Sequence, residues 1–101
     1  MQHYIHYIKR KEILKMHIRN NLKFLRKRAC LSQRSLEKYA NVDYTTIFRI
    51  ETGKTSEQKI TIDTVSKLSS FFQVTIDDFV YEDLSQADDV SLGDRERKSY
   101  E

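Results

Sequence analysis

The sequence predicts a single all-helical domain of five helices. Proline is absent and glycine occurs only twice in 101 residues, whereas the strands of a small β protein need turn residues at short intervals. The apolar residues recur every three or four positions rather than every second position, which is the spacing of a helix face. They make up 39% of the chain, which is enough for one modest core in one domain.

The first two helices are expected at residues 17–29 and 33–40. Spacings of four, three and four mark the apolar face of the first helix, which is formed by Ile18, Leu22, Leu25 and Ala29. Ser32 precedes the second helix and suits an N-cap, because its hydroxyl accepts from N–H groups that the first helical turn leaves unpaired. Leu36 and Ala40 are four residues apart and are expected to face the core.

A third helix is expected at residues 44–51, after a short turn. Asn41 tolerates the left-handed backbone of a tight turn, and Asp43 is the expected N-cap. Gly53 is expected to end the helix, because a left-handed residue commonly follows the last helical turn. The inward-facing residues are expected to be Ile47 and Ile50.

The last two helices are expected at residues 62–72 and directly after Thr75. Thr61 and Thr75 are the expected N-caps, and Asp78 follows the second of them by three residues, as in a capping box. The residues expected to face the core are Val65, Leu68 and Phe72 in the longer helix, and Ile76 and Phe79 in the shorter one.

The chain divides into three expected parts: a basic and aromatic N-terminal extension at 1–15, the helical domain at 16–82, and a charged tail at 83–101. The tail has too few large apolar residues to offset its ordering entropy, so we expect it to be disordered. Cys30 is the single cysteine and is expected to be a small core residue; because it excludes an internal disulfide, we expect a protein of the reducing cytoplasm. No stretch approaches the roughly 20 apolar residues that span a bilayer, so we expect no membrane contact.

Charge is distributed unevenly along the chain. Residues 1–54 carry a net charge of +9 and residues 55–101 a net charge of −6, which together give +3. Positive charge concentrated on one side favours an anionic partner such as nucleic acid, although an ordinary solvated surface has the same composition.

Neither catalysis nor cofactor binding is indicated. His3, His6 and His17 lack carboxylate or cysteine companions at the spacing of metal ligands, and the sequence has no glycine-rich phosphate loop. The acidic pairs at 77–78 and 88–89 suit a helix N-terminus and a solvated tail. We therefore expect no cofactor, no metal and no enzymatic activity.

Two short helices joined by three residues, at 33–40 and 44–51, have the arrangement of a helix-turn-helix. The run LSQRSLEKYANVDYTTIFRIETGK resembles the XRE family, which includes phage repressor and Cro-type proteins. The matching places are Ser32-Gln33, Leu36, Asn41-Val42, the polar segment 43–49, and Ile50 to Lys54. The similarity extends over about residues 17–80 and implies a lambda repressor-like fold.

The sequence departs from the family pattern at a few positions. Glu37 stands where the family usually has a small residue at the crossing of the two motif helices, so its side chain must bend out or the helices must splay. Asn41 and Gln73 replace usual glycines, and Phe71 replaces a residue that is often small. These departures affect the expected local packing and not the expected fold.

The resemblance implies a sequence-specific DNA-binding transcription regulator, expected to be a repressor. In this family the second helix of the motif enters the major groove of double-stranded DNA, where each base pair has its own pattern of donors and acceptors. By position, the residues expected at the bases are Tyr44, Thr45 and Arg49, with Asp43, Thr46 and Phe48 beside them. Those expected at the DNA backbone are Gln33, Arg34 and Lys54, with Asn21 and Lys38 as further candidates.

The family also implies a structural ion pair between Arg26 and Glu51 beneath the recognition helix. It further implies a homodimer on a palindromic operator, because one small motif makes too few base contacts for tight specific binding. The apolar surface expected to pair the protomers is formed by Phe71, Val80 and Tyr81. The alternative is that Phe71 packs onto the first helix or the N-terminal segment of its own chain. The alternative function is that of an antitoxin or another regulator that acts mainly by binding a protein partner.

Overall fold

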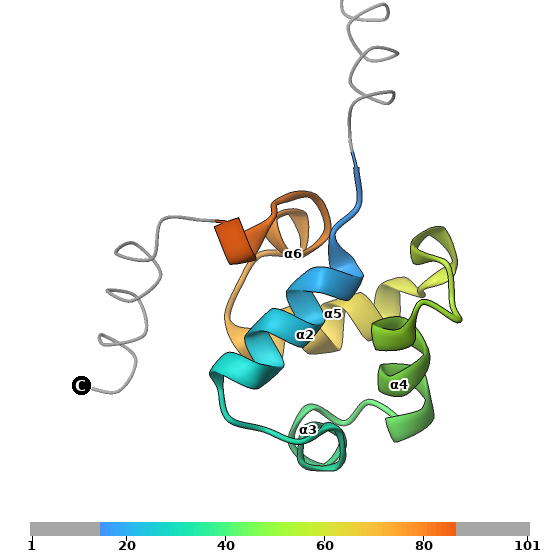
Figure 1. The fold of residues 1–101 in the computed structure, drawn as a ribbon, viewed down its shortest axis with the longest axis vertical. Coiled ribbons are helices and arrows are strands. Elements are labelled where there is room, and N and C mark those ends of the chain that lie inside the picture. The colour runs from blue at the N-terminus through green and yellow to red at the C-terminus, as the bar shows by residue number, and fades with distance from the viewer. Residues whose placement is uncertain (1–14, 87–101) are drawn as a thin grey trace, which may run out of the picture.

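The computed structural model describes residues 15–86. Within this range the chain forms five α-helices, two short 3-10 helices and no strand, so the predicted all-helical class is confirmed (Figure 1). The elements in order are α2 (Ile18–Arg28), α3 (Gln33–Ala40), α4 (Tyr44–Thr52), the 3-10 helix η1 (Glu57–Lys59), α5 (Ile62–Phe72), α6 (Ile76–Tyr81) and the 3-10 helix η2 (Leu84–Gln86). The expected bounds of the four longer helices agree with these to within one residue.

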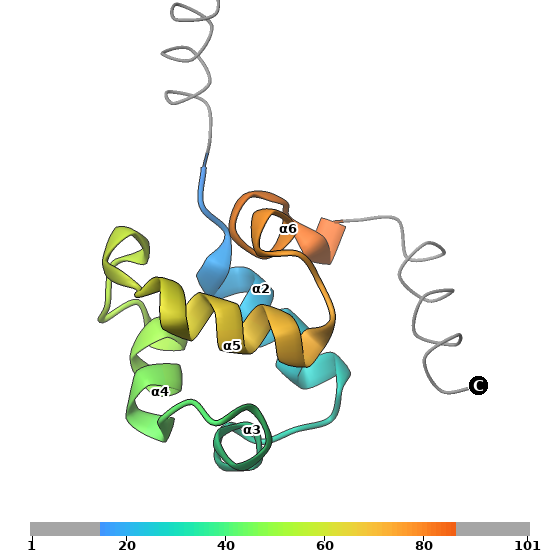
Figure 2. The same ribbon diagram turned by 180° about the vertical axis from the view of Figure 1, so that it is seen from behind.

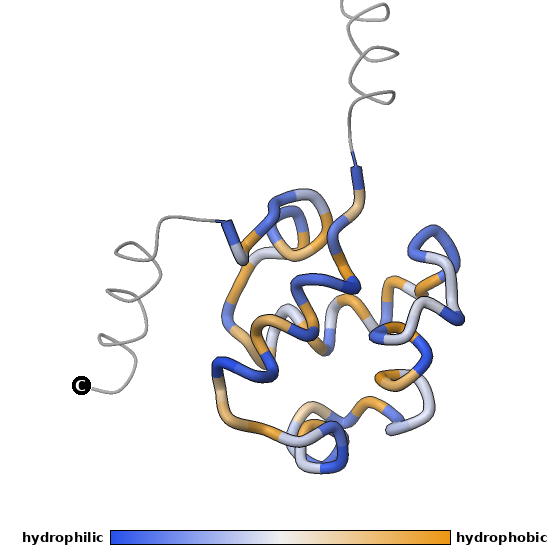
Figure 3. The backbone as a smooth tube through the Cα atoms, in the orientation of Figure 1, coloured by the Kyte–Doolittle hydropathy of each residue, from blue (hydrophilic) through white to orange (hydrophobic). Residues whose placement is uncertain are grey.

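The helices surround one apolar core. Helix α2 lies in front of α5 in Figure 1 and behind it in Figure 2, while α3 and α4 lie together at the end of the domain away from α6. Hydrophobic segments recur along each helix and are separated by hydrophilic ones, as an amphipathic pattern requires (Figure 3). The most deeply buried apolar side chains are Leu22, Leu36, Ile47, Ile50, Leu68 and Phe79.

Several expectations about the last two helices need correction. Ile76 was expected in the core but is 40% exposed, because it is the first residue of α6 and Phe79 already fills the inner position three residues later. Val80 was expected on the surface but is only 8% exposed. Phe71 was expected in the surface that pairs the protomers, but it is half-buried and packs against the core of its own chain beside Phe72, with the two ring centroids 4.9 Å apart. Leu84 extends the core two residues beyond the boundary expected at residue 82.

Asn21 joins the two ends of the described chain. Its fully buried side-chain amide donates to the carbonyl oxygens of Phe79 at 2.7 Å and Glu82 at 2.6 Å, and its Oδ1 accepts from the Leu84 N–H at 2.9 Å. The expectation that Asn21 contacts the DNA backbone is therefore wrong, because the side chain points into the domain. Burying an amide is tolerated here because its polar atoms are satisfied by the backbone that leaves α6.

The C-terminal ends of four helices rely on left-handed residues. Cys30, Asn41 and Gln73 have φ angles of 60°, 60° and 59°, and Gly53 has a φ of 80°. At Cys30 the chain forms a Schellman motif, in which the Cys30 and Leu31 N–H groups donate to Lys27 and Arg26 carbonyl oxygens at 3.0 and 3.1 Å. Cys30 is consequently exposed, which corrects the expectation that it is a core residue.

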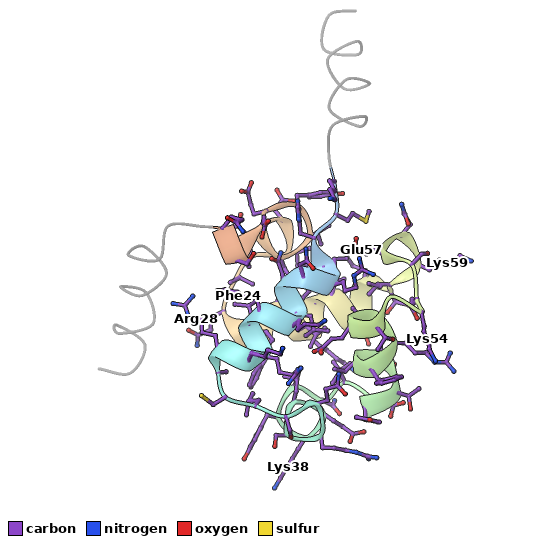
Figure 4. All side chains as sticks on the ribbon, in the orientation of Figure 1. Phe24, Arg28, Lys38, Lys54, Glu57 and Lys59 are labelled. Carbon is purple, nitrogen blue, oxygen red and sulfur yellow. The ribbon has the colours of Figure 1, made fainter. Side chains whose placement is uncertain are left out.

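The N-terminal end of α2 is held by the loop that follows α4. The carboxylate of Glu57 accepts from the backbone N–H of Arg19 at 2.8 Å, so it satisfies one of the unpaired donors of the first helical turn (Figure 4). The guanidinium of Arg19 lies directly over Gly53, where a Cβ atom would collide with it.

Of the helices between residues 15 and 86, none is sufficiently long and apolar to cross a membrane.

Candidate nucleic-acid interface

Helices α3 and α4 form the expected helix-turn-helix. Ser32 caps α3, because its hydroxyl oxygen accepts from the Ser35 N–H at 3.0 Å. Asn41 then adopts the left-handed conformation, which reverses the chain so that α4 can begin at Tyr44. The two helices contact each other, and α4 also packs on α2, so the motif is held by the domain behind it.

Helix α4 has one buried face and one open face. Ile47, Ile50 and Glu51 are 0%, 1% and 5% exposed and anchor the helix to the domain. The opposite face carries the side chains expected to contact bases, of which Thr45 and Arg49 are exposed and Tyr44, Thr46 and Phe48 are half-buried. The sequence-predicted residues therefore occupy one continuous side of α4, which is the side that the domain leaves uncovered.

Two cations and two aromatic rings form a row across the motif, which we call the aromatic row: Arg34, Tyr44, Phe48 and Lys54. The guanidinium carbon of Arg34 lies 4.0 Å from the centre of the Tyr44 ring, and the Tyr44 and Phe48 rings stack with centroids 6.2 Å apart. The Lys54 ammonium lies 5.7 Å from the centre of the Phe48 ring. Cation–π attraction therefore orders both charges beside α4.

The large acidic side chain of Glu37 is accommodated between the motif helices by a hydrogen bond to the start of α4. Its Oε2 accepts from the backbone N–H of Tyr44 at 3.0 Å, so the carboxylate occupies the N-terminal end of α4. Asp43 precedes α4 as expected, but its side chain makes no capping hydrogen bond. The capping role expected of Asp43 is therefore performed by Glu37. Its carboxylate satisfies an unpaired N–H donor of α4 and interacts favourably with the helix dipole.

Arg26 and Glu51 form a two-pronged ion pair under the recognition helix. Arg26 donates from Nε to Glu51 Oε2 at 2.7 Å and from Nη2 to Glu51 Oε1 at 2.8 Å, while Nη1 donates to the Leu31 carbonyl oxygen at 2.8 Å. The hydrogen bond to Glu51 raises the pKa of Arg26 above its ordinary value, against the opposing effect of desolvation. The pair and the bond to Leu31 link α2 and the loop before α3 to the last turn of α4.

Comparison with known proteins shows the family of this motif. A family model described as helix-turn-helix matches residues 22–79, which is more than half of the chain. The chain belongs to the XRE-type helix-turn-helix family.

A solved structure shares the fold. The chain is similar to the crystal structure of a transcriptional regulator from Listeria innocua, with 22% sequence identity, coverage of 86% of this chain and 78% of that chain, and a TM-score of 0.56. No curated protein matches the sequence significantly. Membership of the helix-turn-helix family makes the chain a DNA-binding regulatory protein.

The helix-turn-helix residue Gln33 lies between the ion pair and the surface. Its Nε2 donates to Glu51 Oε1 at 3.0 Å, and the side chain is half-buried. A primary amide has two N–H donors and one acceptor oxygen, so this bond leaves one donor and the oxygen for another partner. Sequence reasoning missed the link to Glu51, because the two residues are 18 positions apart and only the folded motif brings them together.

The charged side chains around the helix-turn-helix point away from the core. Figure 4 shows Lys38 extending from α3 and Lys54 from the segment after α4. Arg34, Lys38, Arg49 and Lys54 are all exposed, so they can reach phosphates without losing an internal contact of the core. Within residues 15–86 no group of three potential ligands could hold a metal ion, and His3 and His6 lie outside the described residues.

Proposed function

We propose that this protein is a sequence-specific transcriptional repressor that binds palindromic duplex DNA as a homodimer and has no catalytic activity. The observation that carries the proposal is the two-sided character of α4. Its inner face is anchored by Ile47, Ile50 and the Glu51 ion pair, while its outer face offers Thr45 and Arg49. A rigid helix with a polar outer face suits the major groove.

The outer face of α4 offers chemistry that distinguishes bases. The Arg49 guanidinium is suited to donate two parallel hydrogen bonds to guanine O6 and N7. The hydroxyl of Thr45 can bond either a donor or an acceptor on a base edge, and its methyl group suits the methyl of thymine. Contacts of this kind give sequence preference, whereas phosphate contacts give affinity without sequence information.

The flanks of the motif are suited to phosphates. Arg34 and Lys54 lie at the two ends of the aromatic row. Lys38 is exposed and follows Arg34 by four residues, about one turn further along α3. Gln33 stands at the first turn of α3, where backbone N–H groups and the helix dipole favour a negative partner. We assign contacts with the DNA backbone to these residues. Such contacts also set the orientation of the motif in the groove.

Dimerisation is supported by the small size of the motif and by an apolar surface remote from α4. With Val80 buried, the exposed apolar side chains of α6 are Ile76 and Tyr81, which are 40% and 38% exposed. Helix α6 lies at the end of the domain opposite α3 (Figures 1 and 2), so a partner bound there leaves the motif open. Pairing two motifs about a two-fold axis then doubles the number of base contacts.

The test is selection of bound sequences from a pool of random duplex DNA by the full chain, followed by affinity measurements on the selected site at several salt concentrations. We expect a palindromic sequence and a steep loss of affinity with salt, because phosphate contacts release counterions. Recovery of the unenriched pool, or binding to all duplexes with equal affinity, would contradict a sequence-specific function. A stable protein complex in place of DNA binding would instead indicate a regulator that acts through protein contacts.

A further inference from the structure

Helix α3 holds Tyr44 at two separate points. The Glu37 carboxylate accepts from the Tyr44 backbone N–H at 3.0 Å, and the Arg34 guanidinium lies 4.0 Å from the centre of the Tyr44 ring. Both residues come from one helix, and they act on the main chain and on the side chain of the same residue. Tyr44 is therefore fixed in position and in ring orientation before any ligand binds.

The fixed ring belongs to an apolar surface at the start of α4. Phe48 stacks against Tyr44 with an angle of 28° between the ring planes, one helical turn further along. Thr45 lies beside Tyr44 on the outer face and adds a methyl group. Tyr44 is only half-buried, so part of its ring remains open to a ligand next to these groups.

The major groove offers one apolar group that suits this surface, the C5 methyl of thymine. The Glu37 carboxylate favours a base over a phosphate at the same place. The N-terminal end of a helix normally attracts phosphate, but here a carboxylate already accepts from its first N–H group and adds a negative charge. The start of α4 is thereby directed at base edges.

We infer that Tyr44 contacts the methyl group of one thymine in the bound DNA, and that Glu37 and Arg34 are positioning residues for that contact. This inference rests on the proposed function. It adds the class of base pair, A·T with the thymine methyl toward Tyr44, and it assigns a DNA-related role to Glu37, which by charge alone would be repelled from DNA.

The test uses the duplex selected by the wild-type protein, with each thymine replaced singly by deoxyuridine, which removes only the methyl group. Loss of one buried methyl corresponds to about a fourfold loss of affinity. We expect this loss at one thymine of each half-site for the wild type, and no difference between thymine and deoxyuridine at that position for Tyr44→Ala. The absence of any thymine at which the wild type distinguishes the two bases would overturn the inference.

Glu37→Gln and Glu37→Ala test the positioning role as a matched pair. Both remove the same charge, but the glutamine oxygen can still accept from the Tyr44 N–H. The quantity to compare is the ratio of the affinity for the thymine duplex to that for the deoxyuridine duplex. We expect Glu37→Gln to keep this fourfold ratio within about a factor of two, and Glu37→Ala to lower it toward one. An unchanged ratio in a folded Glu37→Ala variant would show that Glu37 does not position Tyr44.

Arg34→Lys provides a second measurement that does not depend on the helix cap. It keeps the positive charge but removes the planar group over the Tyr44 ring, so we expect a reduced ratio with little change in salt dependence. If Glu37→Ala does not fold, an unchanged ratio in Arg34→Lys overturns the positioning role. Failure of the wild type to select any sequence would instead overturn the proposed function itself, and the inference with it.

Discussion

The side chain of Asn21 holds the backbone of Leu84, 63 residues further along the chain, through a hydrogen bond of 2.9 Å to its N–H. The same amide donates to the carbonyl oxygens of Phe79 and Glu82. Three backbone groups at the end of the domain thus depend on one buried side chain in α2.

Asn21→Ala is expected to lower the free energy of unfolding by about 3 kcal/mol, because buried backbone groups lose their partners. Chemical denaturation of the full chain measures the change. Asn20→Ala is the matched control, since Asn20 is the exposed neighbour in the same helix and its replacement should change stability by less than about 0.5 kcal/mol. Equal effects of the two substitutions would contradict the stabilising role of the Asn21 hydrogen bonds.

Removal of either partner of the Arg26–Glu51 pair should leave a largely buried charge. We expect Arg26→Ala and Glu51→Ala each to destabilise the domain by about 3 kcal/mol. The double variant should lose less than the sum, with a coupling of about 1–3 kcal/mol. Thermal or denaturant unfolding of all four proteins gives this coupling, and strictly additive losses would mean that the pair does not act as a unit.

Arg49 and Lys54 should have separable effects on DNA binding. Arg49→Ala is expected to relax the preference at one base pair and to cost about 1–3 kcal/mol on the selected site. Lys54→Ala should weaken binding to all duplexes alike and reduce the salt slope by about one. Fluorescence anisotropy on selected and scrambled duplexes distinguishes the two patterns. Wild-type affinity of Arg49→Ala for the selected site would exclude Arg49 from the bases.

The proposed dimer surface can be tested with one substitution placed at two sites. Ile76 and Ile62 are each the first residue of a helix preceded by a capping threonine, and both are exposed. We expect Ile76→Glu to sediment as a folded monomer in analytical ultracentrifugation. Its affinity for the operator should also be weaker than that of the wild type. Ile62→Glu, at the far end of α5, should remain dimeric. An unchanged mass of folded Ile76→Glu would place the interface elsewhere.

Local sequence signals were sufficient for the helices and for the helix-turn-helix. Ser32, Thr61 and Thr75 each accept from the N–H three residues later, as expected of caps. Such signals lie within a few residues of one another, and the apolar spacing of a helix repeats within a single element. The all-helical class and the exposed face of α4 could therefore be predicted without knowledge of the tertiary structure.

The tertiary structure decided the contacts between residues that the sequence keeps apart. Asn21 resembled other polar residues of its helix until the packing of α6 against α2 buried it. Glu37 appeared to disturb the crossing of the motif helices, yet the crossing brings its carboxylate to the Tyr44 N–H and makes it the cap of α4. Whether a polar side chain is solvated, buried or part of a cap depends on the donors and acceptors that neighbouring helices place within about 3 Å, and only the folded chain fixes that distance.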